Sequence, residues 1–283
     1  MVVRLQPPLL DDIEYTQSVI EQRRNGGNAI YFADQANWWQ GRITEYNRER
    51  GDPTRIPPSP IPVDHKDKFI NLYSSSARDH RHVQEIRDLR NSRGKLLVCP
   101  ACGEDGTPRT LDHYLPKTSF PEFAIHLKNL VPMCDVCQGI KGEKFLNNNG
   151  EKYYFHSYFD PIPEELFLID IAPPFSAPSG FRLEVSGDAG PLHSLAERHA
   201  EGLNLQDRIA TYCVEKYSHL LKSTATNRNG AKIEITLLIR AFLINEQQKS
   251  SNSWAALFYR SVLANSRLLD YLDRGILPDF YLP

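Results

Sequence analysis

The chain has 283 residues, of which 41% are hydrophobic and 24% charged, and its formal net charge is -2. This balance is typical of a soluble globular protein with a sizeable core. It excludes binding to polyanions through global charge, so any such site must be a local patch. The start lacks an apolar leader, and the sequence has no run of about 18 apolar residues. We therefore expect a cytoplasmic protein without a membrane span.

Residues 1–92 are predicted to form an N-terminal helical region. The segment DDIEYTQSVIEQRR has apolar residues on one face and ends before a double glycine. The segment FADQANWWQGRITEYNRERG carries Trp38, Trp39 and Tyr46 on one broad stripe. We assign this stripe to the core instead of a base-stacking surface, because helical stripes are normally buried.

A proline-rich connector, PTRIPPSPIP, precedes a further helical stretch over residues 66–90. Tyr73 belongs to the apolar face of this stretch, and the other faces carry Arg78, Arg81, Arg87 and Arg90. We expect a solvated helix face, and only a position beside a metal site would make these arginines phosphate ligands.

The pattern changes after residue 92. In the region of residues 93–152, LLVCPACGEDGTPRTLDHYLP indicates short strands and glycine turns, which predicts a short hairpin. Residues 153–283 begin with irregular strands among prolines and continue as a C-terminal helical region. Its last helix is predicted to start at Ser253, a good N-cap, and to stop at Gly275.

Two C-x-x-C pairs predict a structural zinc site. Their members are Cys99, Cys102, Cys134 and Cys137. Two such knuckles make the tetrahedral thiolate cage that Zn²⁺ prefers, whereas a thioredoxin-like redox site would leave the second pair unexplained. The segment between the pairs is longer than a plain zinc ribbon needs, so it must have structure of its own.

That segment contains LDHYLPK, in which Asp112 directly precedes His113. An imidazole titrates near neutral pH and can deprotonate water, while a carboxylate can hold a hard divalent ion such as Mg²⁺. As neighbours near a strand end, the two side chains are expected to point to opposite sides. Because the dipeptide is common, an ordinary acid-imidazole contact beside a structural metal is the alternative.

The whole segment CPACGEDGTPRTLDHYLPKTSFPEFAIHLKNLVPMCDVCQGIKGEK resembles the HNH nuclease domain, a ββα-metal module, in the subgroup stapled by a four-cysteine zinc. The order of the acid-histidine pair, N-L-V-P, and a C-x-x-C followed by a lysine-bearing helix is that of the family. The resemblance implies an α+β fold. A zinc-stapled ββα-metal HNH core would be flanked by the N-terminal and C-terminal helical regions.

The resemblance also implies the roles of individual residues. Asp112 would be a ligand of a catalytic Mg²⁺ or Mn²⁺, His113 the general base, and Asn129 the residue whose hydrogen bonds tie the base-bearing loop. A simple turn asparagine is the alternative for Asn129. Where the family usually has the second metal ligand, His or Asn, this chain has Gln138. Gln138 offers a carbonyl oxygen on a longer and more mobile side chain, so it either coordinates with altered affinity or leaves the metal site weak.

The function implied is that of an HNH endonuclease acting on nucleic acid, with DNA favoured over RNA. The nucleic-acid contacts expected near the motif are Lys117, Lys141 and Lys144, although each lysine alone is equally consistent with a solvated side chain. Proteins of this general build resemble nuclease subunits of Septu-type bacterial anti-phage defence systems, which act beside an ATPase. We therefore expect an ATPase partner, because a slightly acidic chain needs a local patch or a second protein for affinity.

The tail segment SWAALFYRSVL is a candidate surface for that partner, and packing on the core is the simpler interpretation. The rival to the nuclease hypothesis is a non-enzymatic, zinc-organised module that binds nucleic acid or protein. This alternative remains because Gln138 stands where the family usually has His or Asn as the second metal ligand.

Overall fold

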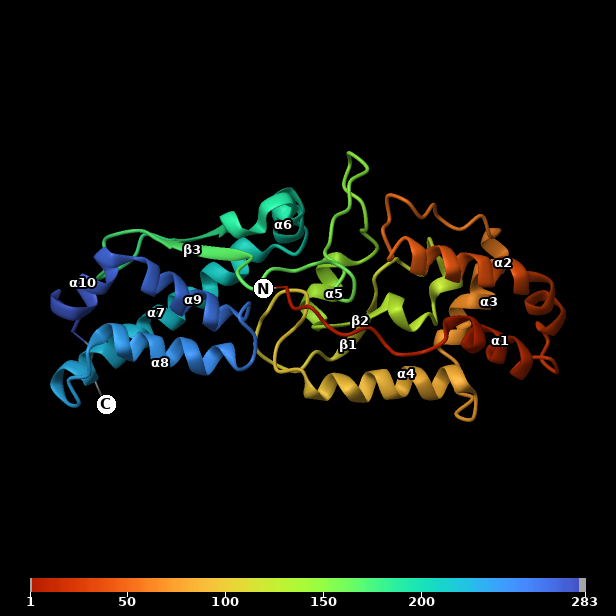
Figure 1. Cartoon of the computed structure of the whole chain (residues 1–283), viewed down its shortest axis with the longest axis horizontal. Helices are drawn as coiled ribbons and strands as arrows, with labels where there is room; N and C mark the ends of the chain where they lie inside the picture. The colour runs from red at the N-terminus through yellow and green to blue at the C-terminus, as the bar shows by residue number, and fades with distance from the viewer. Residues whose placement is uncertain (1, 280–283) are drawn as a thin grey trace. The chain divides into compact units, whose positions relative to one another are not determined.

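The computed structural model describes residues 2–279, and the chain divides into two compact units (Figure 1). The described part of the chain is a mixed α+β structure, in which helices predominate and two antiparallel sheets have two strands each. The first unit consists of residues 4–100 and 107–161. The second unit consists of residues 101–106 and 162–279 together with residues 2–3. The predicted N-terminal helical region thus shares one unit with Cys99, Cys134 and Cys137, while Cys102 belongs to the second unit.

The first unit contains five α-helices, two strands and three short 3-10 helices. Its elements are α1 (Asp12–Gln22), α2 (Ala29–Arg48), α3 (Val63–Tyr73), α4 (Arg81–Ser92), η1 (Arg93–Lys95), β1 (Thr110–His113), η2 (Pro121–Phe123), η3 (Leu127–Asn129), β2 (Leu130–Met133) and α5 (Asp135–Lys141). Asp11 begins α1 by accepting hydrogen bonds from the backbone of Ile13 and Glu14. The helical stretch expected over residues 66–90 is two helices, because serines follow Tyr73 and the Ser75 hydroxyl accepts a bond from the Ala77 backbone.

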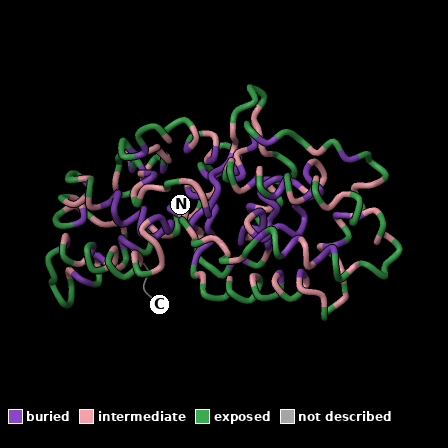
Figure 2. The backbone as a smooth tube through the Cα atoms, turned by 45° about the vertical axis from the view of Figure 1, so that its right-hand side comes forward, coloured by how far each residue is buried: buried purple, intermediate pink, exposed green. Residues whose placement is uncertain are grey.

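The core of the first unit is built on the aromatic stripe of α2. Trp39 is 1% exposed and Tyr46 is fully buried, while Trp38 is half-buried. The ring of Phe69 from α3 meets that of Trp39 edge-on at 4.9 Å. The prediction that this stripe belongs to the core is confirmed. Figure 2 shows buried residues running through the interior of each unit, with exposed positions on the helix surfaces and loops.

The sheet of the first unit pairs two strands that are distant in sequence. Thr110 of β1 lies opposite Met133 of β2, and His113 lies opposite Leu130. Of the predicted short hairpin, the stretch that starts at Leu96 has single bridge residues at Val98 and Asp105, on either side of the first cysteine knuckle, but no pair of regular strands. The glycines at 103 and 106 have φ values of 75° and 121°, and they turn the chain around the first cysteine knuckle instead of linking two strands.

The second unit has a strand pair followed by helices. Its elements are β3 (Phe167–Ile171), β4 (Phe181–Val185), η4 (Gly187–Leu192), α6 (His193–Gly202), α7 (Leu205–Asn229), α8 (Ile235–Gln247), α9 (Trp254–Ala264) and α10 (Ser266–Arg274). β3 and β4 lie in the region where irregular strands were predicted, and they pair antiparallel. No helix within residues 2–279 is both long and apolar enough to cross a bilayer.

The last predicted helix is interrupted once. Ser253 caps α9 by accepting a bond from the Ala256 backbone, which confirms the predicted start. Asn265 ends α9 and caps α10 by accepting a bond from the Leu268 backbone. Trp254 and Phe258 of α9 are 3% and 0% exposed, so the tail packs on the core of its own unit.

Candidate functional site

Four cysteines form a cluster that can hold a structural metal ion. The sulfur atoms of Cys99, Cys102, Cys134 and Cys137 all lie within 4.8 Å of one another. Tetrahedral Zn–S bonds of about 2.3 Å would put the sulfurs about 3.8 Å apart, so this donor set fits zinc in both chemistry and spacing. The predicted gathering of the two pairs is confirmed.

Backbone N–H groups reinforce the cluster. The amide of Cys134 donates to the sulfur of Cys99 at 3.3 Å, and the amide of Cys137 donates to the sulfur of Cys134 at 3.4 Å. Cys134 is thereby the N-cap of α5, so its sulfur lies at the positive end of the helix dipole. Both effects favour the thiolate form that a metal requires.

The knuckle around Cys102 has further support from helices of the second unit. The indole of Trp254 donates to the carbonyl oxygen of Cys102 at 2.6 Å, and the Arg208 guanidinium lies 3.6 Å from its sulfur. Arg208 also pairs with Glu104 at 2.6 Å. These contacts fix the orientation of the knuckle, as hydrogen bonds around metal ligands commonly do.

A separate pocket of about 240 Å³ collects the residues of the acid-histidine motif in the first unit. Asp112 and His113 come from β1, and Gln138 comes from α5. The motif side chains were expected on opposite sides of the strand. Both residues line this pocket, and their side chains have different neighbours, as residues on opposite sides of a strand do. Asp112 contacts Lys141 of α5, whereas His113 contacts Ala124 and Tyr73.

His113 is 9% exposed and is held by one hydrogen bond. Its Nε2 lies 2.9 Å from the carbonyl oxygen of Ala124, which can only accept, so Nε2 carries the proton and Nδ1 is the basic nitrogen. Burial lowers the pKa of His113 to about 4, and the nearby Lys117 adds to this effect. The imidazole is therefore neutral at physiological pH.

Asp112 lies inside the same pocket, paired with a buried lysine. Its Oδ2 is 2.8 Å from the Nζ of Lys141, and the same ammonium donates to the carbonyl oxygen of His113 at 2.9 Å. Burial raises the pKa of Asp112, and the Lys141 charge acts in the opposite direction. This Oδ2 has no hydrogen bond of good geometry among the described residues, so Lys141 is its partner through charge.

Gln138 reaches the same carboxylate. Its Nε2 donates to the carbonyl oxygen of Leu111 at 3.4 Å, and its side chain also bonds to Asp112. The two residues predicted to hold a catalytic metal thus lie side by side. In this arrangement Gln138 presents its amide nitrogen to the acid, so coordination through its oxygen requires the amide to turn.

Asn129 is fully buried where η3 meets β2. Its Oδ1 accepts from the backbone of Leu115 at 2.8 Å, and its Nδ2 donates to the carbonyl oxygens of Leu115 at 3.0 Å and Phe123 at 3.3 Å. These bonds span the loop that follows His113 and ends at Asn129. Through these bonds Asn129 ties together parts of the loop that are distant in sequence.

The three lysines predicted to contact nucleic acid occupy different environments. Lys117 is half-buried at the pocket lining, and Lys144 is exposed. Lys141 is only 1% exposed and is occupied by Asp112. A phosphate contact from Lys141 would therefore require the ion pair to open.

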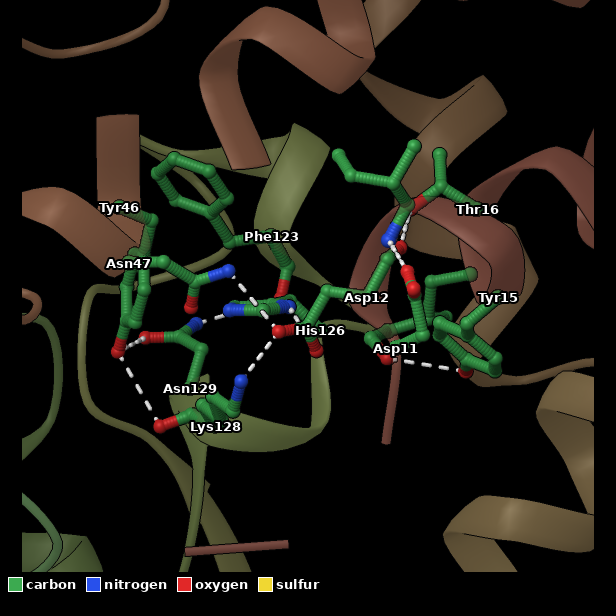
Figure 3. Close-up of polar contacts among 12 residues, drawn as sticks. Asp11, Asp12, Tyr15, Thr16, Tyr46, Asn47, Phe123, His126, Lys128 and Asn129 are labelled. Atoms are coloured by element: carbon green, nitrogen blue, oxygen red, sulfur yellow. Dashed lines mark hydrogen bonds and ion pairs between the residues drawn. The ribbon is translucent and has the colours of Figure 1, made fainter. Parts of the chain in front are cut away.

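A buried polar cluster behind the site was not foreseen from the sequence (Figure 3). Asp12 of α1 pairs with Lys128 and accepts a 2.9 Å bond from Asn47 of α2, and Nδ1 of His126 lies 3.6 Å from its Oδ1. The hydroxyl of Tyr46 donates to Oδ1 of Asn129 at 3.2 Å. The N-terminal helices thus hold the segment that carries Asn129. Local sequence patterns do not predict these contacts, because they join residues that are distant in sequence.

The preceding turn of the loop is held by a second buried pair. Arg42 of α2 lies 2.7 Å from Glu122 of η2, whose side chain is fully buried. The indole of Trp39 donates to the carbonyl oxygen of Glu122 at 2.8 Å. The loop that supplies the Ala124 carbonyl to His113 is therefore anchored on α2.

Comparison with known proteins gives one partial relative. Neither a family model nor a solved structure matches this chain. A stretch of 98 residues is 35% identical to "Protein ea31" of Escherichia phage lambda. The stretch is 34% of this chain and spans 32% of the relative's length.

Proposed function

We propose that this protein is a metal-dependent endonuclease of the HNH type, which hydrolyses phosphodiester bonds of nucleic acid, DNA in preference to RNA. The observation that carries the proposal is the convergence of Asp112, His113 and Gln138 in one pocket, with Asn129 tying the intervening loop. An acid, a neutral imidazole and an amide oxygen are the groups that such a reaction uses. In this proposal the ion of the four-cysteine cluster is zinc, and it has a structural role.

His113 is the general base of the proposed reaction. The Ala124 carbonyl fixes the proton on Nε2, so Nδ1 can accept a proton from a water molecule that attacks phosphorus. The edge-on contact with Tyr73, at 4.6 Å between ring centroids, restricts rotation of the imidazole. Asn129 acts as a positioning residue, because its hydrogen bonds fix the loop that contains Ala124.

Asp112 and Gln138 would hold a catalytic Mg²⁺ or Mn²⁺, hard ions that prefer oxygen ligands. When bound, such an ion supplies charge stabilisation for the phosphate and for the leaving 3′-oxygen. In the arrangement described above, Lys141 provides the positive charge next to Asp112. The ion would therefore compete with Lys141 for the carboxylate.

The biological setting proposed is bacterial anti-phage defence beside an ATPase subunit. Its support is the resemblance of HNH proteins of this general build to nuclease subunits of the Septu type, together with the formal net charge of -2, which leaves little general attraction for nucleic acid. Lys117 at the pocket lining and the exposed Lys144 would supply local phosphate contacts. Co-elution of the two subunits in size-exclusion chromatography tests the partnership.

A cleavage assay tests the proposed activity. We expect the purified protein with added Mn²⁺ to cut supercoiled plasmid faster than single-stranded DNA or RNA, and to be inactive without a divalent ion beyond its zinc. Asp112→Asn keeps the size of the side chain and removes its charge, so it should abolish the dependence on Mn²⁺ together with the activity. Absence of cleavage of all three substrates, with and without the ATPase partner, would contradict the proposal.

A second candidate function is a catalytically weak, zinc-organised module that binds nucleic acid or protein. The observation in its favour is the ion pair between Lys141 and Asp112, at 2.8 Å, in which the protein's own cation neutralises the acid. The orientation of Gln138 also favours this candidate, because its amide nitrogen is turned toward Leu111.

Calorimetric titration with Mn²⁺ separates the two candidates. The nuclease proposal predicts one Mn²⁺ site that Asp112→Asn removes and that Lys141→Met strengthens, because the substitution removes the competing charge. Lys144→Met, a change at an exposed lysine, is the matched control and should leave the affinity as in the wild type. The binding-module interpretation predicts no Mn²⁺ site in any of these proteins.

A further inference from the structure

Two cations lie against one tyrosine ring beside the His113 pocket. The guanidinium carbon of Arg90, on α4, is 5.2 Å from the centroid of the Tyr73 ring, and the ammonium of Lys117 is 5.4 Å from it. The same ring meets the imidazole of His113 at 4.6 Å. Tyr73 and Lys117 both line the pocket. Three segments far apart in the sequence thus bring two positive charges to the edge of the proposed active site.

The charges of Arg90 and Lys117 are not neutralised by the protein. Among residues 2–279, neither cation has a carboxylate within ion-pair distance, whereas the neighbouring Lys141 is paired with Asp112. Glu143 is an acidic group of the pocket lining, but it is exposed and pairs with neither cation. Holding two like charges around one ring is unfavourable unless an anion joins them. Arg90 is exposed and Lys117 half-buried, so an anion from solution can reach both.

We infer that Arg90 and Lys117, held by the ring of Tyr73, form a phosphate clamp that binds the nucleic-acid backbone next to the scissile bond. This inference rests on the proposed function, since it concerns the same substrate. The cations approach the ring, so Tyr73 is a positioning residue for them and not a platform for a stacked base. A guanidinium fork and an ammonium are both suited to phosphate oxygens, and neither reads the base sequence.

Position on α4 separates Arg90 from the other arginines of that helix. Arg87 is exposed like Arg90, yet it makes no ion pair or ring contact in the described part of the chain. The expectation of a solvated arginine therefore fits Arg87, while Arg90 meets the stated exception, a place beside the metal motif. Arg87 is thus a control on the same helix with the same charge.

Salt-dependent binding of a fluorescent DNA duplex to the full-length protein, without added Mg²⁺ or Mn²⁺, tests the clamp. Arg90→Gln and Lys117→Gln should each weaken binding and reduce the slope of log Kd against log salt by about 0.9, the value for one phosphate contact. In the double variant the slope should fall by about twice that amount. Arg87→Gln should retain the wild-type slope. Tyr73→Phe keeps the ring and should bind as the wild type, whereas Tyr73→Leu should weaken binding.

The outcomes separate this inference from the proposed function. If Arg90→Gln and Lys117→Gln keep the wild-type slope, or if the wild type binds no duplex at 50 mM salt, the clamp is wrong, whether or not the protein cleaves DNA. If both variants show the predicted reduction in the slope of log Kd against log salt while the wild type cleaves nothing with Mn²⁺, the clamp is supported and the nuclease proposal fails. Thermal unfolding of each variant shows whether the loss of binding reflects loss of structure.

Discussion

Replacing Cys137 with serine is expected to abolish cooperative folding of the segment that carries the site. A four-thiolate zinc site contributes about 10–16 kcal/mol of apparent free energy in small zinc-binding peptides, as much as the whole stability of a typical domain. β1 and β2 have four residues each and α5 has seven, so these elements are too short to be stable alone. Circular dichroism during heating measures the loss of cooperative folding, and metal analysis measures the loss of bound metal.

Cys213→Ala provides the matched control. Cys213 is also buried, but it belongs to α7 and lies outside the four-cysteine cluster. Its replacement removes one buried sulfur and should cost about 1 kcal/mol of stability while the zinc content stays unchanged. A Cys137→Ser protein with the zinc content and melting temperature of the wild type would show that the cluster holds no structural metal.

Replacing His113 with alanine should reduce the rate of phosphodiester cleavage by about 10²–10⁴-fold, the usual contribution of a general base. The reason is geometric as well as electronic. His113 is the pocket's one imidazole among the described residues; burial favours its neutral form, and the bond to Ala124 fixes its tautomer. Initial rates at saturating Mn²⁺ measure the effect, and His219→Ala, at an exposed histidine of α7, should retain the wild-type rate.

The parts of the site that follow from the sequence are those with short-range signals. Each C-x-x-C pair places its two sulfurs through one tight turn, so the metal cluster could be predicted before the fold. Asp112 and His113 are neighbours and were found together for the same reason. The cap of α9 by Ser253 is likewise a local feature.

The contacts that shape the pocket join residues distant in sequence, and periodicity does not encode them. The pairing of β1 with β2 crosses the whole loop between them, so the turn signals near the first knuckle could not identify the partner of β1. Asp12 meets Lys128, and Tyr73 meets His113, only after the helices have packed. Tyr73 carried the sequence signal of an ordinary core residue.

Lys141 illustrates a different difficulty. A lysine on a short helix is usually solvated, and α5 is too short for its buried face to be read from its sequence. The side chain is buried because Asp112 and the carbonyl oxygen of His113 provide it with partners. Burial of this kind depends on the position of β1, which the sequence pattern did not fix.

The most direct test of the account is chemical rescue of His113→Gly by free imidazole. This substitution removes the proposed base and leaves space for a small molecule. We predict that imidazole restores Mn²⁺-dependent plasmid cleavage in a saturable manner, while Asp112→Asn is not rescued. A His113→Gly protein that is folded and cleaves as fast as the wild type without imidazole would contradict the role of His113. So would a protein that imidazole fails to rescue at any concentration while the wild type is active.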